Sequence, residues 1–399
     1  MSLSNLLSFR RNEIGAVGPL DLLILQPTPF CNLNCDYCYL PERSSTKKMH
    51  PMVIEAAVRR AFESGLVEKE FTIVWHAGEP LVVGIDYYKN AFELIERLRP
   101  KHVTINHSFQ TNATLLTDAW CEFIKEHQIR IGVSVDGPAF LHDQHRVTRT
   151  GAGTHAKVQR GMQLLTKHGI DFHTISVLTK QALALPEEMF KFFTSHGLKR
   201  IGFNVEEREG VHKNSTLEEE GIDAEVSQFL ERFYELNREA GFPLNVRELD
   251  TAFGAIIGYN PAAAKIQSVL GGQENSPFKI VNVDCEGNFS TFSPELLGVE
   301  LPGFGKFTFG NVLTTGFIEA LKNEKFIRAA TAISRGIKMC ETSCDYFGFC
   351  GGGTPANKIF EHDTFEVTET MHCRLHTKLT MNVAMGKMET DLGISAQAV

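Results

Sequence analysis

The chain has 399 residues, of which 43% are hydrophobic, and a formal net charge of −8. This length suits one large α/β domain with an appendage, or two domains, and the acidic balance with scattered Lys and Arg argues against a nucleic-acid partner. No apolar run approaches the length of a membrane span and no secretion signal is recognisable, so we expect a cytoplasmic protein without a membrane partner.

Short β-branched runs alternate with longer amphipathic stretches from about residue 22 to residue 240. This alternation predicts six βα units and a parallel sheet with right-handed crossovers. The expected strands are 22–26, 71–76, 103–110, 130–135, 172–178 and 201–205. The expected helices are 52–64, 87–98, 118–127, 155–168, 186–196 and 218–240, several of them closed by a glycine, at Gly65, Gly169, Gly197 and Gly241. Six units fit a partial (β/α)6 barrel of the TIM type, in which chemistry collects at the carboxyl ends of the strands.

The periodicity weakens after Gly241, and the remainder is expected to be rich in loops. We expect a lead-in at 1–20, a core barrel at 21–240, a bridging region at 241–281 with a linker at 271–277, and a cysteine-rich segment with a C-terminal helix at 282–399.

The first expected strand is followed by three cysteines within eight residues, Cys31, Cys35 and Cys38, without a fourth nearby. An Fe–S cube has four irons, so three thiolates leave one iron open for a small molecule to chelate. A zinc site completed by a distant His or Cys is the alternative, but zinc loops usually bring cysteines as separated pairs. The pattern therefore favours an iron–sulfur cluster with a vacant coordination site.

Polar and glycine-containing motifs follow the next three strands, at 76–80, 110–114 and 134–138. Gly78 permits close approach of the backbone, and Glu79 with Pro80 fixes an extended edge. The side chains suited to hydrogen-bond an amine, a carboxylate or ribose hydroxyls are those of Asn112, Ser134 and Asp136, and Tyr37 is suited to pack on a purine.

With these motifs in place, residues 20–210 resemble the radical S-adenosylmethionine superfamily, which carries this cysteine spacing after the first strand of a partial (β/α)6 barrel. The resemblance implies that Cys31, Cys35 and Cys38 hold a 4Fe–4S cluster whose open iron is chelated by S-adenosylmethionine. One electron from the reduced cluster then yields a 5′-deoxyadenosyl radical that abstracts a hydrogen atom.

The resemblance also implies roles for the motifs at the neighbouring strand ends. Gly78, Glu79 and Pro80 match the motif that positions the amino group of the cofactor, preceded by Ala77 where the family more often has Gly. Ser134 matches a serine near the carboxylate or the ribose. Either Arg146 or Arg149 corresponds to the family's arginine, and the sequence leaves both open.

A second set of cysteines lies in the last part of the chain, at Cys340, Cys344, Cys350 and Cys373. Four thiolates allow a closed shell, which suits a cluster that passes electrons, and a structural zinc is the alternative. Residues 282–374 resemble the SPASM extension of peptide-modifying members of the superfamily, which carries auxiliary 4Fe–4S clusters.

The SPASM pattern is incomplete here, because two of its cysteine positions are Phe292 and Thr354. Cys285 is thereby left without clear partners, and we expect one auxiliary cluster, with a second only if Cys285 takes part. Cys121, on the third expected helix, is expected to be a buried apolar residue.

The chain combines the motifs LQPTPFCNLNCDYCYLP, WHAGEP, STFSPELLG and CGGGTPANK, followed by TET and Cys373. With these motifs nearly the whole chain resembles the cyclophane-forming maturases of ribosomal peptides, the GrrM/OscB group, more than it resembles sulfatase maturases. That resemblance implies a C–C bond between an aromatic ring and the β-carbon of a residue two positions on, in a precursor peptide. The alternatives are a thioether-forming maturase, a sulfatase maturase that makes formylglycine, and a non-catalytic Fe–S scaffold or electron carrier. Ser293 stands where sulfatase maturases use an Asp as proton acceptor, which counts against formylglycine formation.

The base that takes the ring proton is not evident from the sequence, and the candidates are Asp284, Glu295, Asp345 and the pair His76 and His107. The expected partners are the precursor peptide and an electron donor, either a reductase, a flavodoxin or a ferredoxin. About twenty residues precede the first strand, so leader binding is expected in the barrel, in the extension or in another protein. The acidic stretches 206–209 and 218–220 suit a basic leader, although such runs are usually solvated faces.

Overall fold

The computed structural model describes residues 13–259 and 272–393 of the chain. Its strands are β1 (Leu22–Leu25), β2 (Glu70–Trp75), β3 (Thr104–Thr111), β4 (Arg130–Ser134), β5 (Phe172–Leu178), β6 (Arg200–Val205), β7 (Asn245–Val246), β8 (Ile280–Val283), β9 (Asn288–Thr291), β10 (Glu300–Leu301), β11 (Gly305–Lys306) and β12 (Gly310–Asn311). Ten of them form one sheet in the order β12-β9-β8-β1-β2-β3-β4-β5-β6-β7, and β10 pairs with β11.

The helices are α2 (Pro51–Glu63), α3 (Ile85–Leu98), α4 (Asp118–Glu126), α5 (Ala139–His145), α6 (His155–Lys167), α7 (Lys180–Leu183), α8 (Pro186–Ser195), α9 (Ile222–Glu239), α10 (Arg247–Ile257), α12 (Phe317–Ala320), α13 (Glu324–Ser343), α14 (Phe347–Cys350), α15 (Pro355–His362) and α16 (Leu379–Asp391). Shorter turns of helix are η1 (Pro80–Val83), η2 (Pro294–Leu296) and the π-type η3 (Cys373–Lys378).

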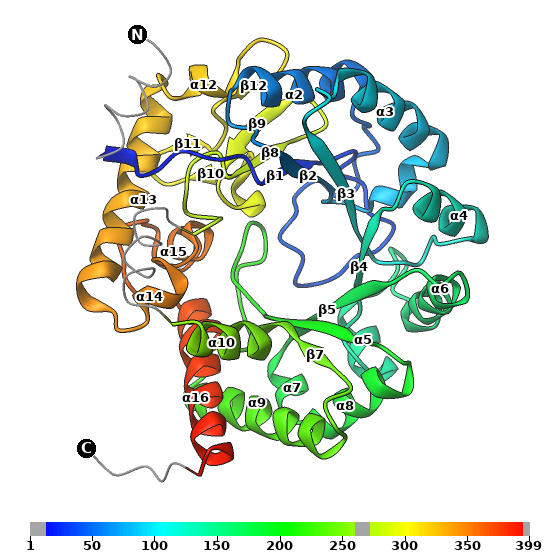
Figure 1. Ribbon diagram of the computed structural model, residues 1–399, viewed down its shortest axis with the longest axis vertical. Helices are drawn as coiled ribbons and strands as arrows, with labels where there is room; N and C mark the ends of the chain where they lie inside the picture. Colours follow the sequence, from blue (N-terminus) through cyan, green and yellow to red (C-terminus); the bar gives the residue numbers. More distant parts are fainter. Residues whose placement is uncertain (1–12, 260–271, 394–399) are drawn as a thin grey trace.

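The sheet curves into an open barrel with helices around its outside (Figure 1). The strands from β8 through β1 to β7 are parallel to their neighbours, while β9 and β12 run antiparallel. The six expected strands and the alternation with helices are confirmed, as is the partial-barrel fold. All carboxyl ends of β1–β6 therefore lie at the same mouth of the barrel.

The hydrophobic core lies between the sheet and the outer helices. Trp75 of β2, Tyr88 of α3 and Phe109 of β3 are fully buried, and the ring of Tyr88 packs 5.1 Å from Trp75 and 4.7 Å from Phe109 between centroids. Aromatic rings bury large areas in fixed mutual orientations, so this layer holds the strand ends rigidly. Cys121 of α4 is fully buried here, as expected.

The helix expected at 218–240 begins later, at Ile222, because Gly221 before it has a φ of +84°, outside the helical region. The loop-rich character expected after Gly241 is wrong for much of that region, since α10, α13 and α15 lie there, whereas the expected C-terminal helix is confirmed as α16. The buried face of α13 includes Phe326, Ala329, Ala330 and Ile333, and this helix is as amphipathic as the expected helices α6 and α9.

The sheet continues past the expected boundary at residue 282. That boundary falls inside β8, which pairs in parallel with β1, and α16 packs on α9 and α10. The expected linker at 271–277 begins at a residue outside the described ranges, and its described part leads into β8. In the described residues, no helix combines the length and apolar character needed to cross a membrane.

Candidate cofactor and active site

The loop after β1 carries the first cysteine set and is held from two sides. Nη1 of Arg149 donates to the carbonyl of Cys31 at 3.1 Å, and Nη1 of Arg43 donates to the carbonyl of Cys35 at 2.8 Å. The backbone nitrogen of Asn34 donates to the carbonyl of Val147 at 2.8 Å. The segment after α5 thus fixes the path of the cysteine loop, and Arg149 acts here on its backbone.

The thiols of this set lie close enough to influence one another's charge. Burial raises the pKa of Cys31 to about 12, with a further contribution from Glu79, and burial raises that of Cys35 to about 11. The Sγ atom of Cys31 accepts from the backbone nitrogen of Leu33 at 3.4 Å and from Nδ2 of Asn112 at 3.9 Å. Buried thiols that accept hydrogen bonds from N–H groups fit an iron–sulfur cluster, because the positive charge of the metal stabilises the deprotonated thiolates.

All nine cysteines are free of disulfides. Within residues 13–259 and 272–393, no group of three or more His, Cys, Asp or Glu side chains is gathered around a single point as one metal ion requires.

The Gly-Glu-Pro motif after β2 lies directly against the cysteine loop. The backbone nitrogen of Glu79 donates to the carbonyl of Phe30 at 2.8 Å. Gly78 has a φ of +63°, and a Cβ there would lie 2.4 Å from the carbonyl oxygen of Thr28 and 2.6 Å from that of Phe30. Ala77 has a φ of +66°, which explains why glycine suits its position. Only glycine allows this approach at residue 78.

The side chain of Glu79 joins two strand ends. Its Oε1 accepts from the hydroxyl of Thr111 at 2.6 Å and from the nitrogen of Leu81 at 3.0 Å, and its Oε2 accepts from the nitrogen of Asn112 at 2.8 Å. Burial raises the pKa of Glu79 to about 7, against the lowering effect of these hydrogen bonds. Pro80 begins η1, and its carbonyl accepts from the hydroxyl of Tyr88 at 2.9 Å.

Asp136, Arg146 and Tyr37 form a buried cluster behind the cysteine loop. Nε and Nη2 of Arg146 donate to the two oxygens of Asp136 at 2.8 and 3.0 Å, and the hydroxyl of Tyr37 donates to the same carboxylate. The guanidinium lies 5.3 Å from the centre of the Tyr37 ring. Burial would raise the pKa of Asp136, but Arg146 beside it holds that pKa below its usual value. These three side chains satisfy one another and anchor the loop.

Ser134 and Asn112 lie at the ends of β4 and β3. The hydroxyl of Ser134 accepts from Nε2 of Gln110 at 3.0 Å, and Nδ2 of Asn112 donates to Oδ1 of Asn32 at 2.9 Å. The side chain of Asn112 therefore contacts the cysteine loop, and that of Ser134 contacts the end of β3.

The second cysteine set is carried by the ends of three helical segments. Cys340 and Cys344 lie at the end of α13, Cys350 ends α14 and Cys373 begins η3. Their thiols influence one another's charge, and a cavity of about 280 Å³ lies against Cys350 and Cys373. Burial raises the pKa of Cys373 to about 12.

Two lysines face the second cysteine set. Nζ of Lys358, which is buried, donates to Sγ of Cys340 at 3.5 Å, and Lys378 lies near Cys344 and Cys373. Four thiols with cations beside them fit a cluster with a closed shell and net negative charge. Cys285 lies in the turn between β8 and β9, near Lys47 and Tyr87, apart from both cysteine sets.

The five candidate bases fall in different places. Asp284 uses its carboxylate inside the β8–β9 turn, where it accepts from the nitrogens of Glu286 and Asn288, each at 2.9 Å. Asp345 is exposed after Cys344. His107 lies outside the barrel wall and stacks 3.9 Å from Phe92 between ring centroids.

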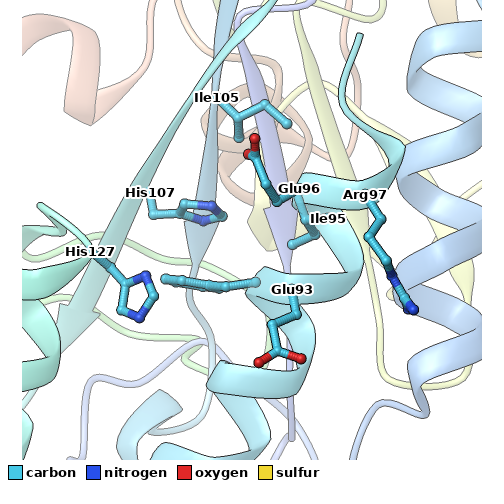
Figure 2. A pocket seen from close by; sticks show the side chains of 8 residues that line it. Glu93, Ile95, Glu96, Arg97, Ile105, His107 and His127 are labelled. Carbon is cyan, nitrogen blue, oxygen red and sulfur yellow. The ribbon is translucent and has the colours of Figure 1, made fainter. Parts of the chain in front are cut away.

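Figure 2 shows His107 and His127 pointing into the same space on that outer side, a cavity of about 800 Å³. Burial lowers the pKa of His107 to about 3, with a further contribution from His127, and its Nδ1 accepts from Nε1 of Trp75 at 3.3 Å. His107 is therefore remote from the barrel mouth.

His76 and Glu295 instead lie near Tyr39, the residue after the third cysteine. Nε2 of His76 is 3.3 Å from the hydroxyl of Tyr39, and burial lowers the pKa of His76 to about 4. Glu295, in η2, acts on the Tyr39 hydroxyl electrostatically, and burial, then neighbouring carboxylates, raises its pKa to about 8.

Sequence reasoning missed a group that we name the carboxylate cluster, formed by Glu207, Glu209, Glu274 and Glu295. The four carboxyl groups act on one another, because Glu209 is influenced by the other three and Glu295 by Glu274 and Glu207. They come from three segments: the hairpin 206–216 after β6, drawn in green at the centre of Figure 1, the loop 272–277, and η2. Only the acidic run 206–209 signalled it in the sequence, and that run was interpreted either as a site for a basic leader or as a solvated face.

A scan of protein families matches the radical SAM superfamily at residues 25–193. An uncharacterized protein of Synechocystis sp. is 41% identical over 392 residues, which cover 97% of each chain. A serine-type anaerobic sulfatase-maturating enzyme of Bacteroides thetaiotaomicron is 26% identical over 361 residues, covering 86% of this chain and 84% of that one.

Two solved structures share the fold. The native anSMEcpe with bound AdoMet has a TM-score of 0.74 at 22% identity, covering 94% of this chain and all of that one (100%). SuiB of Streptococcus suis, bound to its precursor peptide SuiA, has a TM-score of 0.65 at 17% identity, covering 92% of this chain and 79% of that one. The protein thus belongs to the radical SAM superfamily and is an enzyme whose cofactors are a 4Fe–4S cluster and S-adenosylmethionine.

Proposed function

We propose that this enzyme modifies a ribosomally made precursor peptide, joining an aromatic ring carbon to the β-carbon of a residue two positions on. The observation that carries the proposal is the meeting of Tyr39, next to Cys38, with the carboxylate cluster, whose Glu274 hydrogen-bonds the side chain of Thr354 near Cys350. A site between the two cysteine sets suits a reaction that needs a radical, a proton acceptor and an electron acceptor together.

Cys31, Cys35 and Cys38 would hold the cluster that binds S-adenosylmethionine. When bound, these cofactors supply a 5′-deoxyadenosyl radical that removes a hydrogen atom from the substrate. The backbone of Gly78–Pro80, with Asn112 and Ser134, borders the space for the cofactor, and Glu79 orders these strand ends from behind. Asp136, Arg146 and Tyr37 hold the loop in place, and Arg149 orients the carbonyl of Cys31.

The crosslink removes two hydrogens from the peptide, one as an atom and the other as a proton and an electron when the ring regains aromaticity. Glu295 is the proposed proton acceptor, because it faces Tyr39 at the barrel mouth. Cys340, Cys344, Cys350 and Cys373 would hold one auxiliary cluster suited to accept the electron. The proposed reductant of the first cluster is a reductase, a flavodoxin or a ferredoxin.

Formylglycine formation on a sulfatase is the second candidate, favoured by the alignment with the Bacteroides enzyme over most of both chains. Ser293 stands where that group of enzymes uses an Asp, and it is fully buried, whereas Glu295 lies near enough to Tyr39 to act on its hydroxyl electrostatically. Glu295 could thus serve as proton acceptor in either reaction.

The test uses the protein reconstituted anaerobically with iron and sulfide, S-adenosylmethionine and dithionite. We expect 5′-deoxyadenosine from the wild type and from Cys121→Ala, and none above background from Cys35→Ala. Tandem mass spectrometry of a co-expressed precursor should show the loss of two hydrogens and a segment that resists fragmentation between the joined residues. A product that reacts with a hydrazide probe contains an aldehyde and assigns formylglycine instead.

A further inference from the structure

The carboxylate cluster lies within the folded protein at the barrel mouth, and it lacks a strong counter-charge. In the described ranges, none of its four carboxyls forms an ion pair with Lys or Arg, and the ion pair recorded is between Glu207 and His372, at 3.6 Å. Other acidic side chains of the chain, such as Glu187, Glu235 and Asp136, do meet Lys or Arg. Carboxyl groups in such a place hold protons because their negative charges would repel one another, and a cation bound beside them favours their charged form.

The buried side-chain amide of Asn357 contacts the carboxylate cluster. Asn357 is 1% exposed, and its Nδ2 donates to Oε2 of Glu207 at 2.5 Å, while its Oδ1 has no hydrogen-bond partner among the residues that the structure describes. An unpartnered buried carbonyl oxygen is costly unless a donor reaches it. The unpartnered oxygen of Asn357 is a hydrogen-bond acceptor, which matches a ligand that carries N–H donors.

The backbone places this group beside the radical-forming loop. The nitrogen of Val211 donates to the carbonyl of Tyr39 at 3.1 Å. A Cβ on Gly210 would lie 2.2 Å from the same carbonyl oxygen, so the hairpin packs directly on the residue after Cys38. A group bound at the carboxylate cluster thus lies next to the place where the substrate must be held.

We infer that the carboxylate cluster binds the positively charged side chain of an Arg or Lys in the peptide substrate, holding the neighbouring residues at the radical site. This inference rests on the proposed function and names a chemical class for its substrate. A guanidinium spreads five N–H donors over a planar fork and reaches separated acceptors such as Glu207 and the Oδ1 of Asn357. A divalent ion would need the oxygens drawn around one point.

The probes are acetyl-Phe-Gly-Arg-amide and acetyl-Phe-Gly-citrulline-amide, which differ in charge and have nearly the same shape. Binding to the full chain, loaded with its clusters and S-adenosylmethionine, is measured by anaerobic calorimetry. We expect the Arg peptide to bind at least about tenfold more tightly than the citrulline peptide. Equal affinities in the wild type overturn the inference without any variant.

The variant Glu207→Gln/Glu209→Gln keeps side-chain shape and replaces two ionisable carboxyl groups by neutral amides. We expect it to lose most of the preference for Arg, while Glu220→Gln, an exposed change outside the cluster, keeps it. An unchanged preference in the double variant overturns the inference. Uptake of Mn²⁺ that the double variant loses, without discrimination between the peptides, assigns the cluster to a metal ion and also overturns it.

Release of 5′-deoxyadenosine without peptide reports on the proposed function separately. A preference for Arg in a protein that forms no 5′-deoxyadenosine would leave the cation site standing and the proposed function rejected. Formation of 5′-deoxyadenosine with equal peptide affinities would reject the cation site and leave the proposed function standing.

Discussion

Oε2 of Glu79 accepts a hydrogen bond from the backbone nitrogen of Asn112 at 2.8 Å, which joins the chain after β2 to the chain after β3. Because the nitrogen of Glu79 also donates to Phe30, the motif links three strand ends through one residue. The Glu79 carboxylate accepts hydrogen bonds from its own segment and from the end of β3, while the backbone of Gly78–Pro80 borders the cysteine loop.

Gly78→Ala should destabilise the protein more than Gly169→Ala. Both glycines have similar φ values, +63° and +65°, but a Cβ meets backbone oxygens at residue 78 and nothing within 4 Å at residue 169. The φ cost is about 1 kcal/mol at each site, and the clash adds roughly 1–3 kcal/mol at residue 78. Urea unfolding measures the difference, and equal midpoints for the two variants would contradict the close approach.

Asp136→Asn should lower the free energy of unfolding by about 3–5 kcal/mol, because Arg146 is then left buried without its counter-charge. Asp118→Asn is the matched control, since the exposed Asp118 pairs with Lys167 at 2.8 Å on the surface and should change stability little. Thermal unfolding of the reconstituted protein reports both. Similar melting temperatures for the two variants would show that the buried pair does not anchor the loop.

Cys344→Ser and Cys285→Ser should differ in bound iron. Cys344 lies among the second cysteine set, so its loss should remove about half of the iron if each set holds one 4Fe–4S cluster. Cys285 lies apart, beside Lys47, and its loss should leave the iron content unchanged. Colorimetric iron analysis with electron paramagnetic resonance decides, and a drop in the Cys285 variant would indicate a second auxiliary cluster.

Stability should fall as the pH rises from about 4.5 to about 8, and Glu295→Gln should flatten this dependence. Burial and neighbouring carboxylates raise the pKa of Glu295 from 4.5 to about 8, so in this range the folded state holds a proton that the unfolded state releases. The stabilisation is complete below 4.5 and is lost on passing through the folded pKa. The groups that face Glu295 are Glu207, Glu209, Glu274 and Tyr39.

Urea midpoints across this pH range test the prediction, with Glu220→Gln as the control expected to follow the wild type. If Glu295→Gln shows the same slope as the wild type, Glu295 does not hold the proton.

Much of the barrel could be predicted from the sequence, because its information is local. β5 begins and ends at the expected residues, and the helix stops at Gly65 and Gly169 have positive φ values of +69° and +65°. By contrast, α13 was missed although its amphipathic pattern is as marked as that of α6 and α9, so the sequence did carry the signal for this helix.

The acidic run 206–209 shows where local reasoning ends. As a run of charges it suggests a solvated face, yet the hairpin that carries Glu209 folds into the barrel mouth and packs on Tyr39. Its partners Glu274 and Glu295 come from segments more than sixty residues away. No pattern in the sequence relates them.

The sequence by itself determined the order of strands and helices, the spacing of Cys31, Cys35 and Cys38, and the superfamily, because each depends on residues close together in the chain. The tertiary structure decided which polar groups share a site. It paired Arg146 with Asp136, moved His107 outside the barrel wall and gathered four glutamates at its mouth. Those groupings depend on how parallel strand ends and long connections converge, and burial and charge–charge energy act through space rather than along the chain.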